Sequence, residues 1–138
     1  MIKKILVAFD DSEGSSRAFD FASELAEKFK AKLLLLAVVR LPEPTTSLEV
    51  GAILDDAKEH YEKAFQELRD RTNPRGIDFV ATVEVGHPAE HLVALAEKEH
   101  VDLIVMGRRG RTQVGRFFLG STSERVLRYA HCAVTVVK

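Results

Sequence analysis

The sequence has little of three features that would point to particular classes of protein. Its single cysteine, Cys132, excludes a disulfide within the chain and fits a reducing compartment. A formal net charge of -1 favours neither nucleic acid nor a membrane as partner. The opening MIKKILVAFDDS carries only a short apolar run, too short for a signal peptide, and a spanning helix needs about 20 apolar residues. We therefore expect a soluble, cytoplasmic protein that binds neither nucleic acid nor membranes.

The composition is that of one globular domain. Of the 138 residues, 46% are hydrophobic and 30% are charged, which leaves enough apolar side chains for a core of ordinary size. The chain has no internal repeat, low-complexity segment or linker. Residues 1–138 are therefore expected to form a single domain.

Five apolar segments predict strands. The runs at 5–9 and 33–39 are continuously apolar, as in strands buried on both faces. The segment 101–106 is apolar apart from Asp102, and Ala133–Val137 is a further apolar strand. Residues 77–85 alternate apolar and polar side chains, which indicates a strand near the edge of a sheet.

Segments with helical spacing separate these strands. Helices are expected from a cap at Asp11 or Ser12 to about Phe29, at about 48–71, from Pro88 through Ala96, and from Ser121 or Thr122 onward. Strands that alternate with helices predict an α/β fold with an open parallel sheet and helices on both faces.

The segment MGRRGRTQVGRFFLGS, residues 106–121, lies between a predicted buried strand and a predicted helix. From position 107 to 128 there are six arginines and one acidic residue, a net charge of +5. Glycine allows close approach of the backbone to a ligand, and a helix start presents unpaired N–H groups to an anion. The segment also follows the carboxyl end of a strand, where open α/β sheets bind ligands. This pattern favours a phosphate site, and a solvated arginine face on a simple turn remains the alternative.

Common nucleotide motifs fit this segment poorly. The stretch from Gly115 to Ser121 has the spacing of a P-loop but lacks its lysine, and no G-x-G-x-x-G follows the first strand. The pattern Gly107-x2-Gly110-x9-Gly120-Ser121 instead resembles the G-2x-G-9x-G-[S/T] signature of ATP-binding universal stress proteins. The resemblance covers the whole chain, including ILVAFDDSE, the Gly-x-Pro-Ala-Glu from Gly86, and GSTSERVLRYAHCAVTVVK.

This resemblance implies a fold, a ligand and a set of site residues. The family's sheet is ordered 3-2-1-4-5, and its ligand is ATP, or ADP or AMP, with Mg²⁺ or Mn²⁺ left open as a companion ion. By this resemblance the base lies against the ends of the first two strands, and the loop and the last helix hold the ribose and phosphates. The matching residues are Ala8, Phe9, Asp10, Val38, Met106, Gly107, Arg109, Gly110, Gly120, Ser121, Thr122 and Ser123. Two positions depart from the family: Asp11 stands where glycine is common, and Phe9 is bulky enough to change how a base fits.

The leading interpretation is a stress-response binding module that holds an adenine nucleotide, with no catalytic residues and no metal ligands of its own. Phosphoryl transfer usually needs Mg²⁺ ligands and a residue that positions the nucleophile, and Glu124 is the only acidic residue of the loop region. We therefore expect weak ATP hydrolysis at most. The alternatives are a slow ATP-hydrolysing or phosphate-transferring enzyme, and a nucleotide-free scaffold that binds a partner protein.

Three other patterns have simpler explanations. The stretch from His87 to His91 spells an inverted zinc-protease motif, but Pro88 in the first helical turn predicts a helix entry with a surface histidine. Cys132 is expected to pack beside the last strand rather than to act as a redox thiol. Ser12 is expected to cap a helix.

The last predicted strand, Ala133–Val137, bears on assembly. In the order 3-2-1-4-5 it is an edge, and it carries neither charge nor proline. Proteins that this chain resembles pair such edges antiparallel, so we expect a homodimer. A monomer whose edge is covered by its own helices is the alternative.

Overall fold

The computed structural model describes residues 1–42, 46–108 and 119–138, and contains one parallel sheet of five strands. The strand order is β3-β2-β1-β4-β5, and every pair of neighbours is parallel. The strands are β1 (Lys4–Ala8), β2 (Lys32–Val39), β3 (Phe79–Val85), β4 (Leu103–Gly107) and β5 (Ala133–Val137). The predicted fold class and the strand order implied by the family resemblance are both confirmed.

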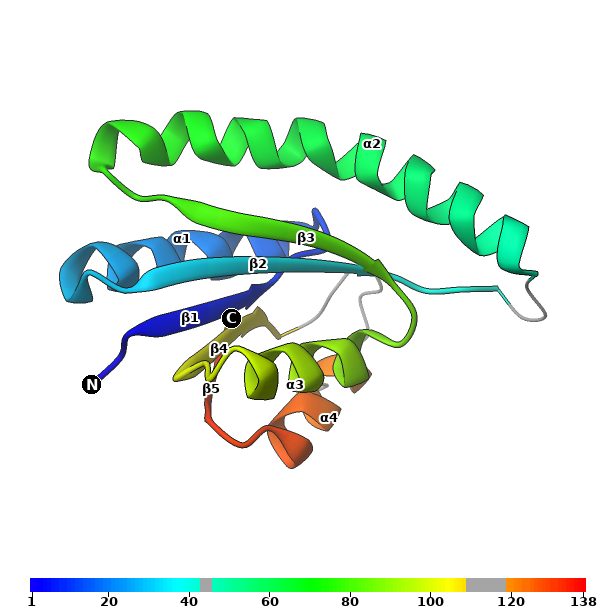
Figure 1. Cartoon of the computed structure of the whole chain (residues 1–138). Coiled ribbons are helices and arrows are strands. Elements are labelled where there is room, and N and C mark those ends of the chain that lie inside the picture. Colours follow the sequence, from blue (N-terminus) through cyan, green and yellow to red (C-terminus); the bar gives the residue numbers. More distant parts are fainter. Residues whose placement is uncertain (43–45, 109–118) are drawn as a thin grey trace.

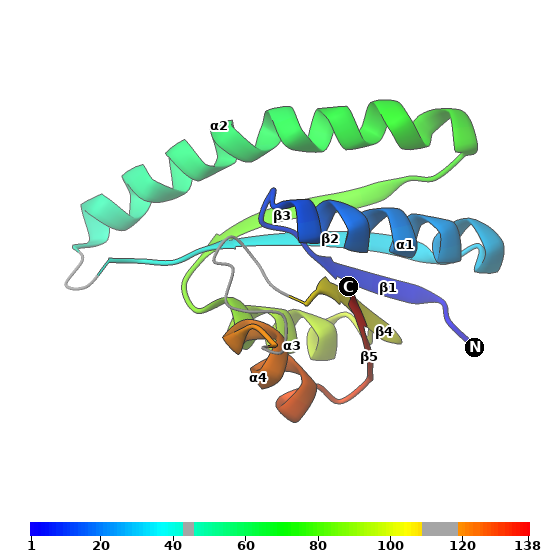
Figure 2. The same cartoon turned by 180° about the vertical axis from the view of Figure 1, so that it is seen from behind.

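Four α-helices cover the two faces of this sheet (Figures 1 and 2). They are α1 (Glu13–Phe29), α2 (Ser47–Thr72), α3 (Pro88–Lys98) and α4 (Ser121–Tyr129), and a short 3₁₀ turn, η1 (Asn73–Arg75), follows α2. Helices α1 and α2 lie on one face, and α3 and α4 lie on the other. None of the described helices is both long and apolar enough to cross a membrane.

Each face of the sheet has its own hydrophobic core. Ile5 and Val7 of β1 point to the α1 and α2 side, whereas Leu6 between them points to the α3 and α4 side. All three are 0% exposed. Successive strand residues point to opposite faces, so a central strand covered on both sides must be apolar at every position. This explains the unbroken apolar runs of the central strands and the alternating pattern of the edge strand β3.

Local signals start and end the helices close to the predicted positions. Ser12 caps α1, because its side chain accepts a hydrogen bond from the Ser15 N–H at 3.1 Å. The start of α2 carries a reciprocal capping box between Thr46 and Glu49 that the sequence analysis missed. Gly76 adopts a φ of 71° where the chain leaves η1, a conformation that glycine takes without strain.

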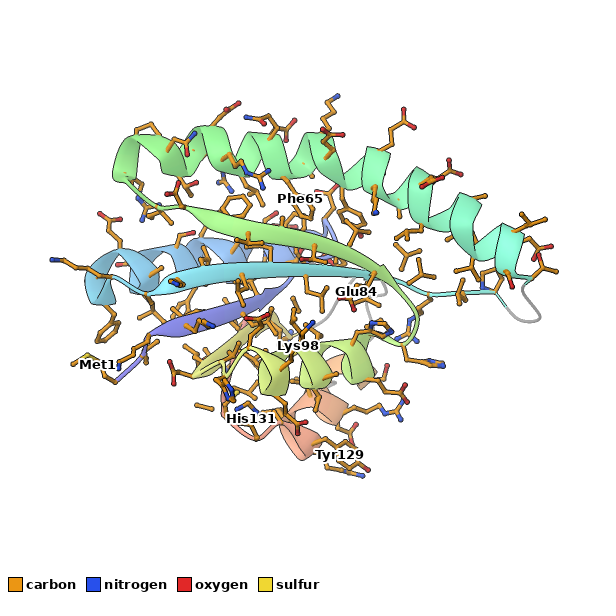
Figure 3. The ribbon with its side chains drawn as sticks, in the orientation of Figure 1. Met1, Phe65, Glu84, Lys98, Tyr129 and His131 are labelled. Carbon is orange, nitrogen blue, oxygen red and sulfur yellow. The ribbon has the colours of Figure 1, made fainter. Side chains whose placement is uncertain are left out.

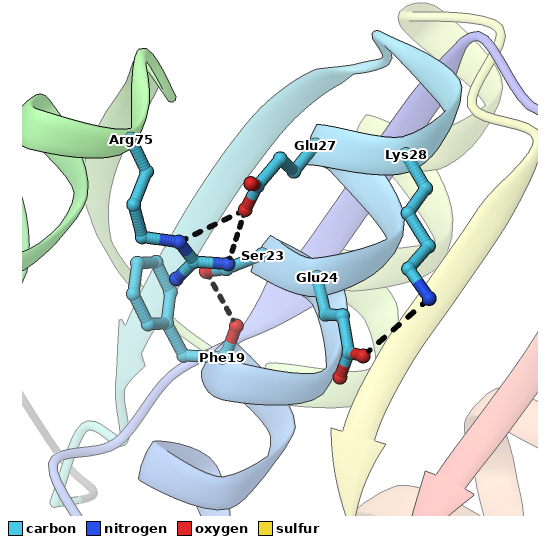
Figure 4. A network of polar contacts seen from close by, with 6 residues as sticks. All are labelled: Phe19, Ser23, Glu24, Glu27, Lys28 and Arg75. Carbon is cyan, nitrogen blue, oxygen red and sulfur yellow. Dashed lines mark hydrogen bonds and ion pairs between the residues drawn. The ribbon is translucent and has the colours of Figure 1, made fainter.

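One polar contact joins η1 to α1, and another lies within α1 (Figure 4). The Arg75 guanidinium donates to Glu27 Oε2 at 2.6 and 2.9 Å, and the buried Ser23 hydroxyl donates to the Phe19 carbonyl at 2.7 Å. Three residues separate η1 from β3, so the Arg75 contact lies close to the start of that strand.

A second set of contacts joins two strands at the amino end of the sheet. The Asp102 carboxylate, just before β4, accepts hydrogen bonds from the backbone N–H groups of Lys3 and Lys4 at 2.8 and 3.0 Å. These two bonds hold the pKa of Asp102 below its ordinary value, because they stabilise the charged form. The amino ends of β1 and β4, the two strands on either side of the candidate site, are thus joined.

Strand β5 is an edge strand, as expected, since its sheet neighbour is β4 on one side. Ala133 is exposed and the other four residues are partly exposed. The strand has no charged residue before Lys138 that would oppose pairing with another strand.

We expect two copies of the chain to pair through this edge. Thr135→Lys should then convert the dimer to a monomer, because the substitution places a charge at the centre of the new strand pair. Sedimentation at micromolar concentration distinguishes the two states. A wild-type species of 15.4 kDa, with or without ATP, contradicts the dimer, and a Thr135→Lys dimer places the interface elsewhere.

Candidate functional site

A cleft of about 870 Å³ opens at the carboxyl edge of the sheet, where the strand order reverses between β1 and β4. Its volume lies within the range of small-molecule sites. The cleft is lined from the ends of β1, β2 and β4 and from the starts of α1, α3 and α4, with Tyr61 added from the middle of α2.

Ten of the twelve predicted site residues line this cleft. They are Ala8, Phe9, Asp10, Val38, Met106, Gly107, Gly120, Ser121, Thr122 and Ser123. The other two, Arg109 and Gly110, lie outside the described residues. The tertiary structure therefore gathers segments more than 100 positions apart into one site, while their role in binding stays a prediction.

The start of α4 provides donors for an anion. The helix begins after Gly120, which makes no side-chain cap, and the first backbone bond of the helix runs from the Glu124 N–H to the Gly120 carbonyl at 3.0 Å. The N–H groups of the three preceding residues, 121–123, have no intrahelical acceptor by position. These three residues line the cleft, so the positive end of the helix dipole faces it.

The Ser123 side chain has a structural role. It is 3% exposed, and its hydroxyl donates to the Gly107 carbonyl at 2.9 Å. This hydroxyl is therefore not free to donate its proton to a phosphate. The backbone N–H of Ser123 remains at the helix start.

The two flanks of the segment 109–118 are held together by backbone bonds. The Gly120 N–H donates to the Arg108 carbonyl at 2.9 Å, and the Arg108 N–H donates to the Val137 carbonyl at 3.0 Å. The start of α4 is thereby fixed to the ends of both β4 and β5.

Gly107 is required by backbone packing. A Cβ atom at this position would lie 2.9 Å from the carbonyl carbon and oxygen of Gly14 in α1. Such a contact forces a shift of backbone. The first glycine of the signature thus lets the end of β4 approach α1, and no ligand is needed to explain it.

The end of β1 forms a tight turn into α1. Asp10 Oδ1 accepts from the Ser12 N–H at 3.0 Å, which orients the carboxylate at the edge of the cleft. Asp11 adopts a φ of 63°, in the left-handed region. This gives a physical reason why glycine is common at the matching position, and aspartate is among the side chains that tolerate this conformation.

The Phe9 side chain obstructs the binding of a base less than its size indicates. It is 3% exposed, and its ring contacts those of Tyr61 and Phe65 with centroids 6.3 and 5.9 Å apart. Figure 3 shows Phe65 between α2 and the sheet. Most of the Phe9 ring is therefore accommodated in the core under α2.

The sequence analysis missed several residues that line the cleft, among them Arg40, whose side chain is positively charged. Arg40 directly follows β2, and its Nη2 donates to Thr122 Oγ1 at 3.3 Å. Open α/β sheets bind ligands at the carboxyl ends of their strands, and this rule applies to the end of β2 as it does to Asp10 after β1 and Gly107 of β4. Tyr61, by contrast, comes from the middle of α2, and its position carried no such signal.

The positions of His87 and Cys132 fit the simpler explanations of these patterns. His87 is an exposed residue at the cap of α3, with Pro88 in the first turn, and His91 Nδ1 bonds to Glu84 of β3. No group of three or more His, Cys, Asp or Glu that could hold a metal ion occurs within residues 1–42, 46–108 and 119–138. Cys132 packs against the core on the α3 and α4 side, and burial raises the pKa of its thiol.

A parallel open sheet with a ligand-sized cleft at the reversal of strand order defines an α/β protein of the doubly wound class. The model of the universal stress protein family matches residues 1–138, and the chain belongs to this family. The universal stress protein MJ0531 of Methanocaldococcus jannaschii is 34% identical, over all of this chain and 83% of that protein.

Solved structures agree with this assignment. The universal stress protein UspA from Lactobacillus plantarum is similar, with a TM-score of 0.81, 26% identity, and coverage of 99% of this chain and 98% of that one. A universal stress protein solved in complex with cAMP has a TM-score of 0.76 and 26% identity, with coverage of 99% and 97%.

The packing of Gly107 leads to a stability prediction. Gly107→Ala should lower the free energy of unfolding by about 1–3 kcal/mol, because the new methyl group overlaps the Gly14 backbone. Gly51→Ala is the matched control, since a Cβ at this helical position has nothing within 4 Å and should stabilise the chain by about 0.5–1 kcal/mol. Urea unfolding measures both changes, and a Gly107→Ala variant of wild-type stability contradicts the packing argument.

Proposed function

We propose that the protein binds an adenine nucleotide, with ATP as the expected ligand, in the cleft at the carboxyl edge of the sheet. The observation that carries this proposal is the start of α4, whose unpaired N–H groups face the cleft beside a hydroxyl and a guanidinium. Phosphate oxygens are suited to such donors.

The other end of the cleft suits a base. Leu36, Val38 and Met106 provide apolar surface, and the Asp10 carboxylate stands at its edge as a hydrogen-bond acceptor for an amino group. The similar universal stress protein in complex with cAMP supports an adenine ring as occupant. Mg²⁺ or Mn²⁺ would enter with the nucleotide and be held by its phosphates.

We further propose that the protein acts as a binding module that responds to nucleotide, with at most slow hydrolysis. The described residues that line the cleft include two carboxylates, Asp10 and Glu124. Asp10 accepts a backbone N–H, and Glu124 pairs with Arg128 at 3.4 Å. In this proposal Asp10 contacts the base, and the pairing of Glu124 with Arg128 gives it another task, so neither carboxylate is assigned to orient a water molecule, which favours binding over phosphoryl transfer.

Gly120→Val tests the phosphate end of the site. Gly120 has φ -60° and ψ 151°, a conformation open to any residue, so the backbone itself does not demand glycine here. A valine side chain should instead block the approach of phosphates, and the variant should lose ATP binding while it stays folded. Calorimetric titration with ATP measures the loss, and urea unfolding is the control for folding. Wild-type affinity in the folded variant contradicts the proposed site.

Salt should reveal whether charge holds the ligand. Exposed charges are screened over about 8 Å at physiological ionic strength, so ATP affinity should fall as salt rises. ATP should also bind more tightly than adenosine, and the adenosine affinity should change little with salt. Calorimetry with both ligands at several salt concentrations measures this difference. Equal and salt-independent affinities would mean that the cleft does not hold phosphates.

A further inference from the structure

Arg40 links two walls of the cleft that are distant in sequence. It follows the last residue of β2, and its guanidinium donates to Thr122 Oγ1 in the first turn of α4 at 3.3 Å. The two residues are 82 positions apart, and both line the cleft. The guanidinium therefore stands beside the helix start that would receive phosphates.

The charge of Arg40 is available for a ligand. Among the described residues that line the cleft, it is the sole lysine or arginine. Its hydrogen bond goes to a neutral hydroxyl, whereas the two cleft carboxylates have other contacts: Asp10 accepts the Ser12 N–H, and Glu124 pairs with Arg128. A guanidinium that leaves a hydroxyl to bind an anion forms a stronger hydrogen bond, because charge-assisted hydrogen bonds are about twice as strong as neutral ones.

We propose that Arg40 determines the preference of this site for a nucleotide with two or three phosphates over one with a single phosphate. This inference rests on the proposed function. A phosphate oxygen bound by the Thr122 N–H lies next to Oγ1 of the same residue, which the guanidinium already contacts. The Arg40 guanidinium then moves its hydrogen bond from the Thr122 hydroxyl to the phosphate. Each further phosphate of the ligand brings more negative charge within reach of this guanidinium.

Three variants separate this role from a structural one. Arg40→Gln removes the charge and keeps a hydrogen-bond donor for Thr122, and Arg40→Lys keeps the charge without the planar fork. Lys98→Gln, in an exposed residue at the end of α3, is the matched control for the loss of one positive charge outside the cleft (Figure 3).

Calorimetry with ATP, AMP and adenosine provides the measurement. Arg40→Gln should weaken ATP binding about tenfold, AMP binding less, and adenosine binding less than about twofold. Arg40→Lys should recover most of the ATP affinity, and Lys98→Gln should behave as the wild type.

The remaining outcomes separate failure of this inference from failure of the proposed function. An equal loss for ATP and adenosine in Arg40→Gln means that Arg40 only holds the cleft walls together, and overturns the inference. Wild-type ATP affinity in Arg40→Gln also overturns it, while the proposed function stands. A wild-type chain that binds neither ATP nor AMP overturns both.

Discussion

The hydrogen bond from the Ser123 hydroxyl to the Gly107 carbonyl fixes the start of α4 against the end of β4. Two backbone bonds act beside it, from Gly120 to Arg108 and from Arg108 to Val137. A helix start aims its N–H groups at a site only if it is held in place. Without these bonds the positive end of α4 would have no fixed position relative to the strands, and the cleft would lack one wall.

The approach of β4 to α1 is a second constraint on the same region. Gly107 meets the Gly14 backbone so closely that no side chain fits between them. The glycine signature thus combines two requirements. Gly107 serves the packing of the protein, whereas Gly120 has an ordinary extended conformation that any residue can adopt, so its role is the proposed one at the phosphate end. A shared glycine pattern therefore does not assign the same role to each of its members.

The proposed site and the proposed dimer edge share these connections. The Val137 carbonyl of β5 accepts the Arg108 N–H, and the Gly120 N–H donates to the Arg108 carbonyl. A ligand on the first turn of α4 is therefore two backbone hydrogen bonds from the edge strand. This is a short physical path that would couple nucleotide binding to the pairing of edge strands.

The sequence by itself determined the elements of the fold, because their signals are local. Unbroken apolar runs predicted the central strands, alternation predicted the edge strand β3, and the side chain of Ser12 predicted the start of α1. Tertiary structure alone decided that Arg40 meets Thr122, that Tyr61 reaches the cleft from α2, and that Ser123 is bonded to Gly107 rather than directed at a ligand. Such contacts depend on the relative placement of elements many residues apart, and no periodicity or cap within a single segment records that placement.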